Sequence, residues 1–341
     1  MYNHLVRMTD STGIIQFSEK GRPLKSSGYT VDDNARALLV AMNMKDKVRE
    51  RLSKIYTSFL EEAQDESGYW NNLKIEDQFV PVINSEDCIG RAFMAASFAM
   101  GCDMEDIKQA SERMIKKSLE KVLNVEAPRA IAYVLLGLVY LIDNFKVYSE
   151  LYQAAKKMAY KLVKLYEENY TKSWHWFEDK LTYCNALLPH SLFSYYAISG
   201  DKRVLEVAQS TLRFLTDALF KRGYLNIVGN RGWWKKEEKI PLYDQQPVDA
   251  ASIILACLQA FLSTGEKEYF FKAKVAYDWY WGKNINEIPL INRETQGCHD
   301  ALTPDGVNQN QGAEAIVSFL LAHQILEKID EKKEMVLIPA V

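Results

Sequence analysis

Residues 32–44 read DDNARALLVAMNM, two acids followed by a helix-like run of small and apolar side chains. The same pattern, an acidic or amide-rich start and then an Ala-rich apolar stretch, returns along the chain. The later copies are EDCIGRAFMAASFAM (86–100), EAPRAIAYVLLGLVYLI (126–142), NALLPHSLFSYYAI (185–198), QQPVDAASIILACLQAF (245–261) and NQGAEAIVSFLLAHQIL (310–326). Their starts lie 40 to 65 residues apart, which fits one helical hairpin and a loop per repeat.

Charge-rich segments separate these copies, and their apolar residues recur at helical spacing beside a Lys/Glu face. They are residues 45–62, 104–122, 147–169, 202–220 and 267–281. A single solvent-exposed face is typical of outer helices. The Ala-rich segments lack a polar face, and their small side chains allow close helix packing. Six inner and five outer helices leave one outer helix missing. Residues 1–9 and the tail after Asp330 are the two candidates for it.

The pattern predicts an all-α fold, an (α/α)6 barrel in which six helical hairpins close into a toroid, as one domain over residues 1–341. The alternative is an open α-solenoid, in which the same hairpins stack without closing. Long loops rich in aromatic, Gly and Asn residues lead into inner helices, so a closed ring would gather them at one end. These loops are residues 67–85, 171–184 and 221–244.

Composition excludes several classes of protein. Lys and Arg number 42 against 45 Asp and Glu, a formal net charge of -3, and without a basic run we expect no nucleic-acid partner. The start MYNHLVRMTDSTG does not resemble a secretory signal, so we expect a cytoplasmic protein. The longest apolar run, residues 132–142, is too short for a membrane span. Five Cys and five His are widely scattered, and we expect no disulfide framework, metal or cofactor.

Acids crowd the starts of the inner helices and the loops before them. They are Asp32, Asp33, Glu86, Asp87, Glu126, Glu178, Asp179, Asp244, Asp249, Asp300 and Glu314. Any one of them can be a helix cap, but so many carboxylates at a shared mouth would repel one another. Paired carboxylates are what glycosidic cleavage uses. We therefore predict a catalytic pair made of Asp32 or Asp33 and an acid from across the mouth, Asp249 or Asp300.

Aromatic, amide and charged side chains in the same loops suit a sugar ring, which stacks on ring faces and takes hydrogen bonds. Packing of the same aromatics against the barrel rim is the alternative. The predicted substrate-binding residues are Arg36, Trp70, Asn71, Glu86, Asp87, Trp176, Glu178, Asp179, Trp233, Tyr243, Asp244, Gln245, Gln246, His299, Asn310, Gln311 and Glu314. Arg36 is also expected to keep one catalytic acid ionised.

Several uninterrupted motifs carry a resemblance that runs over almost the whole chain. They are HLVRMTDSTGIIQFS (4–18), GYTVDDNARAL (28–38), SEDCIGRA (85–92), WFEDKLTYCNALLP (176–189), YDQQPVDAA (243–251) and GCHDALTPDGVNQNQGAEA (297–315). Together they resemble a family of six-hairpin glycosidase-like proteins, found alone or fused behind glycosyltransferases. The resemblance implies the (α/α)6 barrel and a functional association with glycosyltransferases. The pair Asp32-Asp33 also resembles the Asp-Asp pair of α-mannan-cleaving six-hairpin glycosidases.

The leading functional hypothesis is a glycoside hydrolase that acts on a small oligosaccharide, mannose-containing ones included, by paired-carboxylate acid/base chemistry. Two alternatives stay open. One is a sugar 2-epimerase, which shares this barrel and abstracts a proton with histidines, here His190 and His299. The other is a non-catalytic sugar-binding domain, which binds saccharide without turnover.

Overall fold

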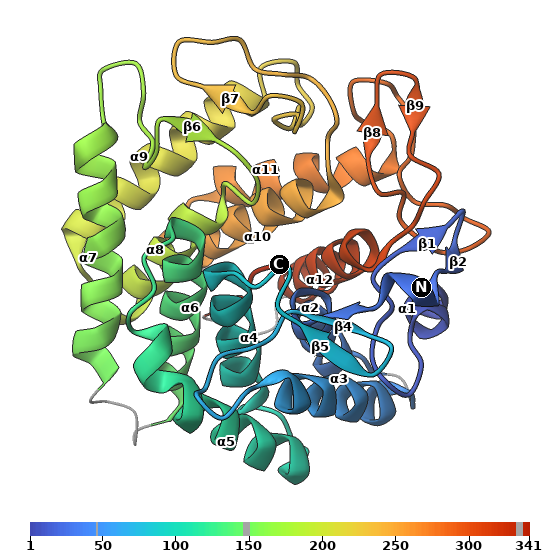
Figure 1. The fold of residues 1–341 in the computed structure, drawn as a ribbon. Helices are drawn as coiled ribbons and strands as arrows, with labels where there is room; N and C mark the ends of the chain where they lie inside the picture. The colour runs from blue at the N-terminus through green and yellow to red at the C-terminus, as the bar shows by residue number, and fades with distance from the viewer. Residues whose placement is uncertain (46, 146–150, 332–336) are drawn as a thin grey trace.

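Six inner helices form a closed ring. The computed structural model describes residues 1–45, 47–145, 151–331 and 337–341. The inner helices are α2 (Val31–Met42), α4 (Glu86–Ala99), α6 (Pro128–Asn144), α8 (Leu187–Ser199), α10 (Pro247–Thr264) and α12 (Ala313–Asp330). Each packs on the next, and α12 packs on α2, so the ring surrounds the C mark in Figure 1. The (α/α)6 barrel is confirmed, and the open solenoid is excluded.

Small residues allow the inner helices to approach closely. A Cβ at Gly90 on α4 would lie 2.9 Å from the Ala130 carbonyl oxygen of α6, and one at Gly137 on α6 would lie 2.9 Å from the Phe93 ring of α4. A side chain at either position would push the two helices apart. Glycine lowers the helix propensity at these two positions, but it allows the two helices to pack closely.

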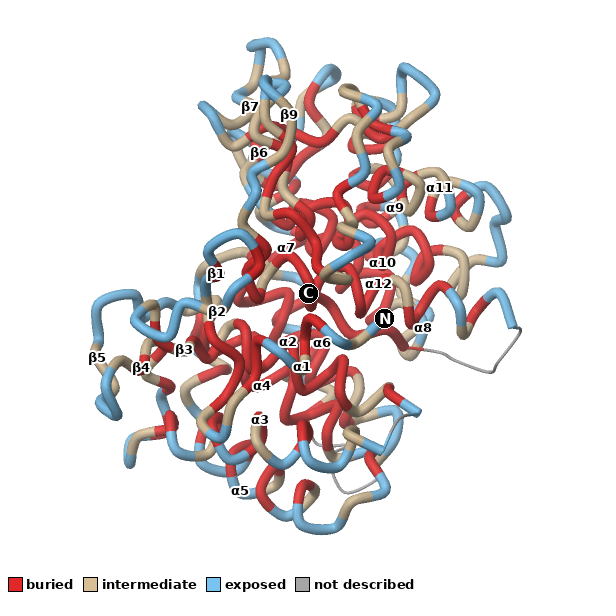
Figure 2. Tube along the Cα trace, turned by 90° about the vertical axis from the view of Figure 1, so that its right-hand side faces the viewer, coloured by how far each residue is buried: buried red, intermediate tan, exposed pale blue. Residues whose placement is uncertain are grey.

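Outer helices cover the ring and leave one face in water. They are α3 (Arg49–Ala63), α5 (Glu105–Val122), α7 (Tyr152–Asn169), α9 (Lys202–Leu219) and α11 (Lys267–Asp278). These match the expected amphipathic segments, although residues 46 and 146–150 of those segments lie outside the described residues. In Figure 2 the buried trace runs through the ring, and the exposed trace follows the outer helices and loop tips.

The sixth outer position is filled from the start of the chain. The short helix α1 (Asn3–Met8) packs on α12, so of the two candidates residues 1–9 supply it. In the tail after Asp330, residues 332–336 lie outside the described residues. Residues 337–341 are not helical, and all five are buried. The expectation of a helix there is wrong for those five residues, which run into the barrel.

Short antiparallel hairpins build the loops at one end of the barrel. They are β1 (Ser18–Glu19) with β2 (Arg22–Pro23), the sheet of β3 (Tyr29–Thr30), β4 (Leu73–Ile75) and β5 (Gln78–Val80), β6 (Lys180–Leu181) with β7 (Trp234–Lys235), and β8 (Leu302–Thr303) with β9 (Gly306–Val307). Tyr29 lies opposite Lys74, and Leu181 lies opposite Trp234. Single-turn 3-10 helices lie at Lys25–Ser27 and Trp279–Trp281.

One helix of the described residues, α10 (Pro247–Thr264), is long and apolar enough to cross a membrane, but 78% of it is buried inside the protein. Its apolar faces pack against α8, α11 and α12. It is a core helix of the barrel.

Candidate active site at the barrel mouth

Two cavities lie at the starts of the inner helices, and they share four side chains. The first, of about 340 Å³, is lined by Gln16, Phe17, Thr30, Asp32, Asp33, Arg36, Ile83, Gln246, Pro247, Asp300, Gly312, Glu314 and Ala315. The second, of about 300 Å³, is lined by Asp32, Arg36, Ser85, Asp87, Arg91, Tyr183, Cys184, Trp233, Gln246, Val248 and Glu314. Asp32, Arg36, Gln246 and Glu314 belong to both. The two cavities are therefore halves of one mouth.

Asp32 is an ionised carboxylate open to both cavities. Arg91 of α4 binds Oδ1 through Nη1, and the Asn72 side-chain amide donates to Oδ2 at 2.8 Å. Burial alone would raise the pKa of Asp32, but the charges of Arg91 and Arg36 and these hydrogen bonds outweigh it and hold that pKa below 3.8. The side chain stays 24% exposed, so its carboxylate can reach a ligand.

Asp33 has the opposite environment although it is the next residue. Its N–H donates to Thr30 Oγ1 at 3.1 Å, and the Thr30 hydroxyl donates to Asp33 Oδ2 at 2.7 Å, which caps α2. Arg36 Nη1 donates to the other oxygen at 3.2 Å. Burial raises the pKa of Asp33 to about 6 against the pull of Arg36, with Glu314 adding to the rise. Both oxygens are engaged, so Asp33 holds the helix start and Arg36.

Asp300 approaches the mouth from the loop before β8. Its Oδ1 accepts the Gly312 N–H at 2.5 Å. Burial raises the pKa of Asp300 to about 6 in spite of that hydrogen bond, and the negative charge of Glu314 adds to the rise. Glu314 itself is half-exposed and ion-paired with Arg36 at 3.0 Å. A carboxyl group with a raised pKa therefore lines the same cavity as the ionised Asp32.

Asp249 lies beneath the mouth and lines neither cavity. Its Oδ1 accepts the Cys184 N–H at 2.6 Å, in a turn where Cys184 has a positive φ of 43°. Burial raises the pKa of Asp249 to about 7, and the Cys184 N–H opposes the rise. Of the two partners proposed across the mouth, the structure brings only Asp300 into a cavity with Asp32.

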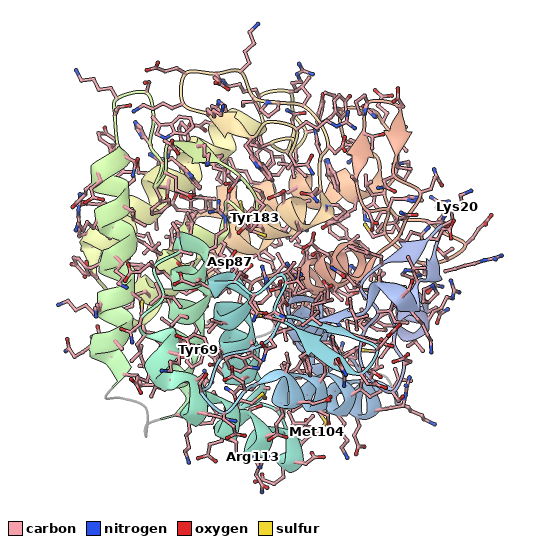
Figure 3. All side chains as sticks on the ribbon, in the orientation of Figure 1. Lys20, Tyr69, Asp87, Met104, Arg113 and Tyr183 are labelled. Carbon is pink, nitrogen blue, oxygen red and sulfur yellow. The ribbon has the colours of Figure 1, made fainter. Side chains whose placement is uncertain are left out.

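Aromatic side chains border the mouth on both sides. The Tyr183 hydroxyl donates to Asp87 Oδ2 at 2.5 Å, a pair labelled near the centre of Figure 3. The Trp233 ring lies 6.3 Å from the Tyr183 ring, and exposed Phe17 lines the other cavity. Phe17 was missed because one aromatic in a polar loop carries no periodic signal.

Structures of known proteins share this arrangement of helices. A sugar epimerase from a ruminal bacterium has a TM-score of 0.72 at 13% identity, over 98% of this chain and 96% of that one. The cellobiose 2-epimerase of Spirochaeta thermophila DSM 6192 has 0.71 at 12% identity, over 96% and 93%. An α-mannanase from Bacteroides thetaiotaomicron has 0.66 at 13% identity, over 97% and 94%. The chain shares the (α/α)6-barrel fold of these structures. No protein-family model matches the sequence, and no curated protein matches it.

Within this six-hairpin fold, several residues proposed as sugar contacts serve the fold instead. Trp70 is 1% exposed and donates its indole N–H to the Leu60 carbonyl at 2.9 Å, and Trp176 is fully buried. Neither can present a ring face to a ligand, so these two assignments are wrong. Both were proposed because a loop tryptophan looks alike in sequence whether it faces outward or into the protein.

Three polar assignments are also corrected. Glu86 Oε2 accepts the backbone N–H groups of residues 126 and 127 at 2.8 and 2.6 Å and so orders the start of α6. Gln245 is buried and accepts the Trp279 indole N–H at 2.9 Å. Gln311 is 2% exposed and accepts the Thr295 hydroxyl at 2.6 Å. These contacts occupy the groups that a sugar would need.

The remaining proposed contacts lie in the rim loops and line neither cavity. They are Asn71, Glu178, Asp179, Tyr243, Asp244, His299 and Asn310. Glu178 pairs with Arg129 at 3.0 Å, Asp244 pairs with Arg231 at 3.0 Å, and the Tyr243 hydroxyl donates to Asn286 at 2.6 Å. Proposed contacts that do line the mouth are Arg36, Asp87, Trp233, Gln246 and Glu314.

The two histidines of the epimerase alternative do not meet in the mouth. His190 is buried on α8 and donates through Nε2 to the Ile338 carbonyl at 3.0 Å, and burial lowers its pKa to about 3. His299 is buried beside Asp300, and burial lowers its pKa too. Neither lines a cavity of the mouth. Among the described residues, no group of three His, Cys, Asp or Glu side chains is placed to hold a metal ion.

Proposed function

We propose that the protein is a glycoside hydrolase that acts on a small, neutral oligosaccharide at the barrel mouth. The observation that carries the proposal is a single cavity in which the pKa of Asp32 is lowered and that of Asp300 is raised to about 6. Such a separation assigns one group as the base or nucleophile and the other as the acid. Asp33 and Glu314 line the same cavity, but Thr30 and Arg36 engage Asp33, and Arg36 pairs with Glu314.

In the proposed reaction, protonated Asp300 gives its proton to the glycosidic oxygen as the bond from that oxygen to the anomeric carbon breaks. The Asp32 carboxylate faces the positive charge that develops on the sugar ring. It either attacks the anomeric carbon or takes a proton from the water that does, and the two routes differ in whether the product keeps its anomeric configuration. Arg36 binds Asp33 and Glu314, and Arg91 binds Asp32. The two arginines fix the positions of these side chains, and their charges keep Asp32 ionised.

The lining favours a neutral substrate of more than one sugar ring. Carboxyl groups outnumber the two arginines Arg36 and Arg91, and both arginines already bind carboxylates. An anionic sugar would meet more repulsion than attraction. Aromatic rings at opposite sides, Phe17 in one cavity and Trp233 in the other, offer a stacking face to each of two sugar units on either side of Asp32.

Sugar 2-epimerisation is the second candidate, favoured by the higher TM-scores of the epimerase structures. It requires a base that can remove the proton at C2. In this chain that base would have to be a mouth carboxylate, because His190 and His299 line neither cavity. A non-catalytic sugar-binding domain is the third, and it would use the same aromatic faces.

One experiment separates the three. The protein is incubated in D2O with α-1,6-mannobiose, β-1,4-mannobiose and cellobiose, and products are followed by NMR. A hydrolase releases monosaccharide without deuterium at C2. An epimerase leaves the disaccharide intact and exchanges C2, and a binding domain gives line broadening with no product. C2 exchange without hydrolysis would overturn the hydrolase proposal. The cytoplasmic location and the association with glycosyltransferases stay predictions.

A further inference from the structure

Residues 337–341, LIPAV, run through the inside of the helix ring. Ile338 is fully buried and Val341 is 1% exposed, and the C mark lies at the centre of the ring in Figure 1. The Ile338 N–H donates to Gln259 Oε1 at 2.9 Å, and its carbonyl accepts from His190 at 3.0 Å. The segment is therefore pinned to α10 and α8 from opposite sides of its backbone.

From this segment a chain of contacts reaches the mouth. The Tyr133 hydroxyl of α6 donates to the backbone oxygen of Val341 at 2.5 Å. Arg91 Nη2 donates to the same hydroxyl oxygen at 2.7 Å, and Arg91 Nη1 binds Asp32. The Arg91 guanidinium also lies over the Tyr133 ring, 4.6 Å from its centre. Val341, Tyr133 and Arg91 are buried, and only the Asp32 end of this chain of contacts is partly exposed.

The direction of these hydrogen bonds matters. A tyrosine hydroxyl has one proton to give and lone pairs to receive. Because the Val341 backbone oxygen takes the proton, the lone pairs of Tyr133 point to Arg91, and the guanidinium is held with one edge on Tyr133 and the other on Asp32. Without that acceptor, the hydroxyl proton is free to turn toward Arg91, where two donors would oppose each other.

We propose that residues 337–341 are a positioning element of the mouth: they orient the Tyr133 hydroxyl, which holds Arg91 against the Asp32 carboxylate. Tyr133 is then a positioning residue and touches no substrate. The inference rests on the proposed function insofar as Asp32 serves catalysis. A segment that only fills the barrel would stabilise the fold and leave the properties of Asp32 unchanged.

The test depends on the groups around Asp32, which come from every neighbouring element. They are Asp33 and Arg36 on α2, Asp87, Cys88 and Arg91 on α4, Tyr133 on α6, Tyr183 and Cys184 before α8, Asp300 before β8, and Glu314 on α12. Arg91 lowers the pKa of Asp32. A variant in which Arg91 is held less firmly must therefore have a higher pKa at Asp32. The other groups are the same in the variant and the parent, so they do not contribute to the difference.

Tyr133→Phe removes the hydroxyl and keeps the ring. We expect the acidic limb of the pH–rate profile to move upward by roughly half to one pH unit, part of the 1–3 units a neighbouring arginine contributes, with kcat lowered more than KM. Tyr56→Phe is the matched control, because it removes another buried, hydrogen-bonded hydroxyl, 2.7 Å from Thr9 Oγ1, at a residue that lines neither cavity of the mouth. An unmoved acidic limb in Tyr133→Phe would overturn the proposal.

A second measurement needs no turnover. Asp32 has a lowered pKa in the folded protein, so its pairing stabilises the fold above the unfolded pKa and is lost as pH falls through the folded one. The Tm difference between parent and Tyr133→Phe should therefore be largest near neutral pH and shrink below pH ~4. For Tyr56→Phe it should stay constant. If no saccharide is cleaved but this pattern is seen, the proposed function fails and the positioning role stands. A Tm difference for Tyr133→Phe that does not change with pH would mean that residues 337–341 only fill the barrel.

Deleting residues 337–341 and adding the peptide LIPAV in excess tests the segment itself. We expect the deleted protein to show the same upward shift and the peptide to reverse it. A scrambled peptide of equal composition is the control. If both peptides reverse the shift, or if neither does so while the deleted protein is folded, the role given to the Val341 backbone oxygen is contradicted.

Discussion

The mouth and an outer groove over α9 are both concave and both aromatic, yet they differ in where their charges lie. The groove, about 610 Å³, is larger than either cavity of the mouth and is lined by residues of α9, β7 and the loop 172–175. Its charged side chains Lys172, Arg213, Asp217 and Lys221 are exposed. In the mouth, Asp33, Arg36 and Arg91 are each less than 5% exposed. Burial shifts pKa values, so the mouth, and not the groove, has the properties of a catalytic site.

The strand β7 connects the two regions. Trp234 is the first residue of β7, and Trp233 directly precedes the strand with a positive φ of 58°. Trp233 lines the mouth, whereas Trp234 lines the groove and stacks on Phe214 at 5.6 Å. The pair offers matched substitutions, one on each side of the same backbone.

The largest difference is expected from carboxylates. Asp32→Asn and Asp300→Asn should each lower kcat/KM by roughly 10²-fold or more, the scale of positioned acid or base catalysis, with folding intact by circular dichroism. Asp217→Asn, an exposed acid of the groove, is the control and should keep its rate. Initial rates of saccharide hydrolysis measure all three. Full activity in both mouth variants would remove the catalytic assignment.

The pH dependence of the rate should report the same two groups. The donor Asp300 must be protonated, and its pKa is about 6, so the rate should fall about tenfold per pH unit above that value. The base Asp32 must be ionised, and its lowered pKa puts the loss on the acidic side below pH ~4. In Asp300→Asn the alkaline limb should vanish; its persistence would assign it to another group, Asp33 being the first candidate.

How far sequence reasoning reached follows from what each signal encodes. Six Ala-rich repeats at hairpin spacing report which helix faces are buried, and that is enough for a closed ring of inner helices. The adjacent acids Asp32 and Asp33 were placed at the mouth on the same ground. Both line the first cavity, and which of the two is ionised and open to a ligand depends on Thr30, Arg91 and Asn72. Arg91 and Asn72 come from other parts of the chain.

Side-chain direction in loops was beyond reach for a similar reason. Trp70 and Trp233 sit in similar loops, but one donates to a helix carbonyl inside the fold and the other lines the mouth. Loops have no period that separates the two cases. The buried tail 337–341 was also missed, because a five-residue apolar stretch is too short to predict an element.

Trp233→Ala should weaken saccharide affinity by about 2- to 12-fold, equivalent to the ~0.5–1.5 kcal/mol of a ring contact. The half-buried ring lies beside Tyr183 and borders the cavity, and it carries no hydrogen bond that the fold requires. Isothermal titration with a non-hydrolysed thio-linked disaccharide measures the change. An affinity equal to the parent's would show that the ring only packs on Tyr183.

Trp234→Phe is expected to have the smallest effect. It tests whether the packing of Trp234 in the groove is independent of the position of Trp233 in the mouth. Phenylalanine keeps a ring against Phe214 and loses only the indole N–H donated to the Glu238 carbonyl at 2.9 Å, a bond worth about 0.5–1.5 kcal/mol of stability. Because β7 pairs with β6 over only two residues, a larger truncation would let the strand shift and carry Trp233 with it. The conservative change should leave hydrolysis and affinity within twofold of the parent while Tm falls by a few degrees at most. A loss of affinity like that of Trp233→Ala would mean that packing of Trp234 in the groove sets the position of Trp233 in the mouth. The groove and the mouth would then not be independent regions.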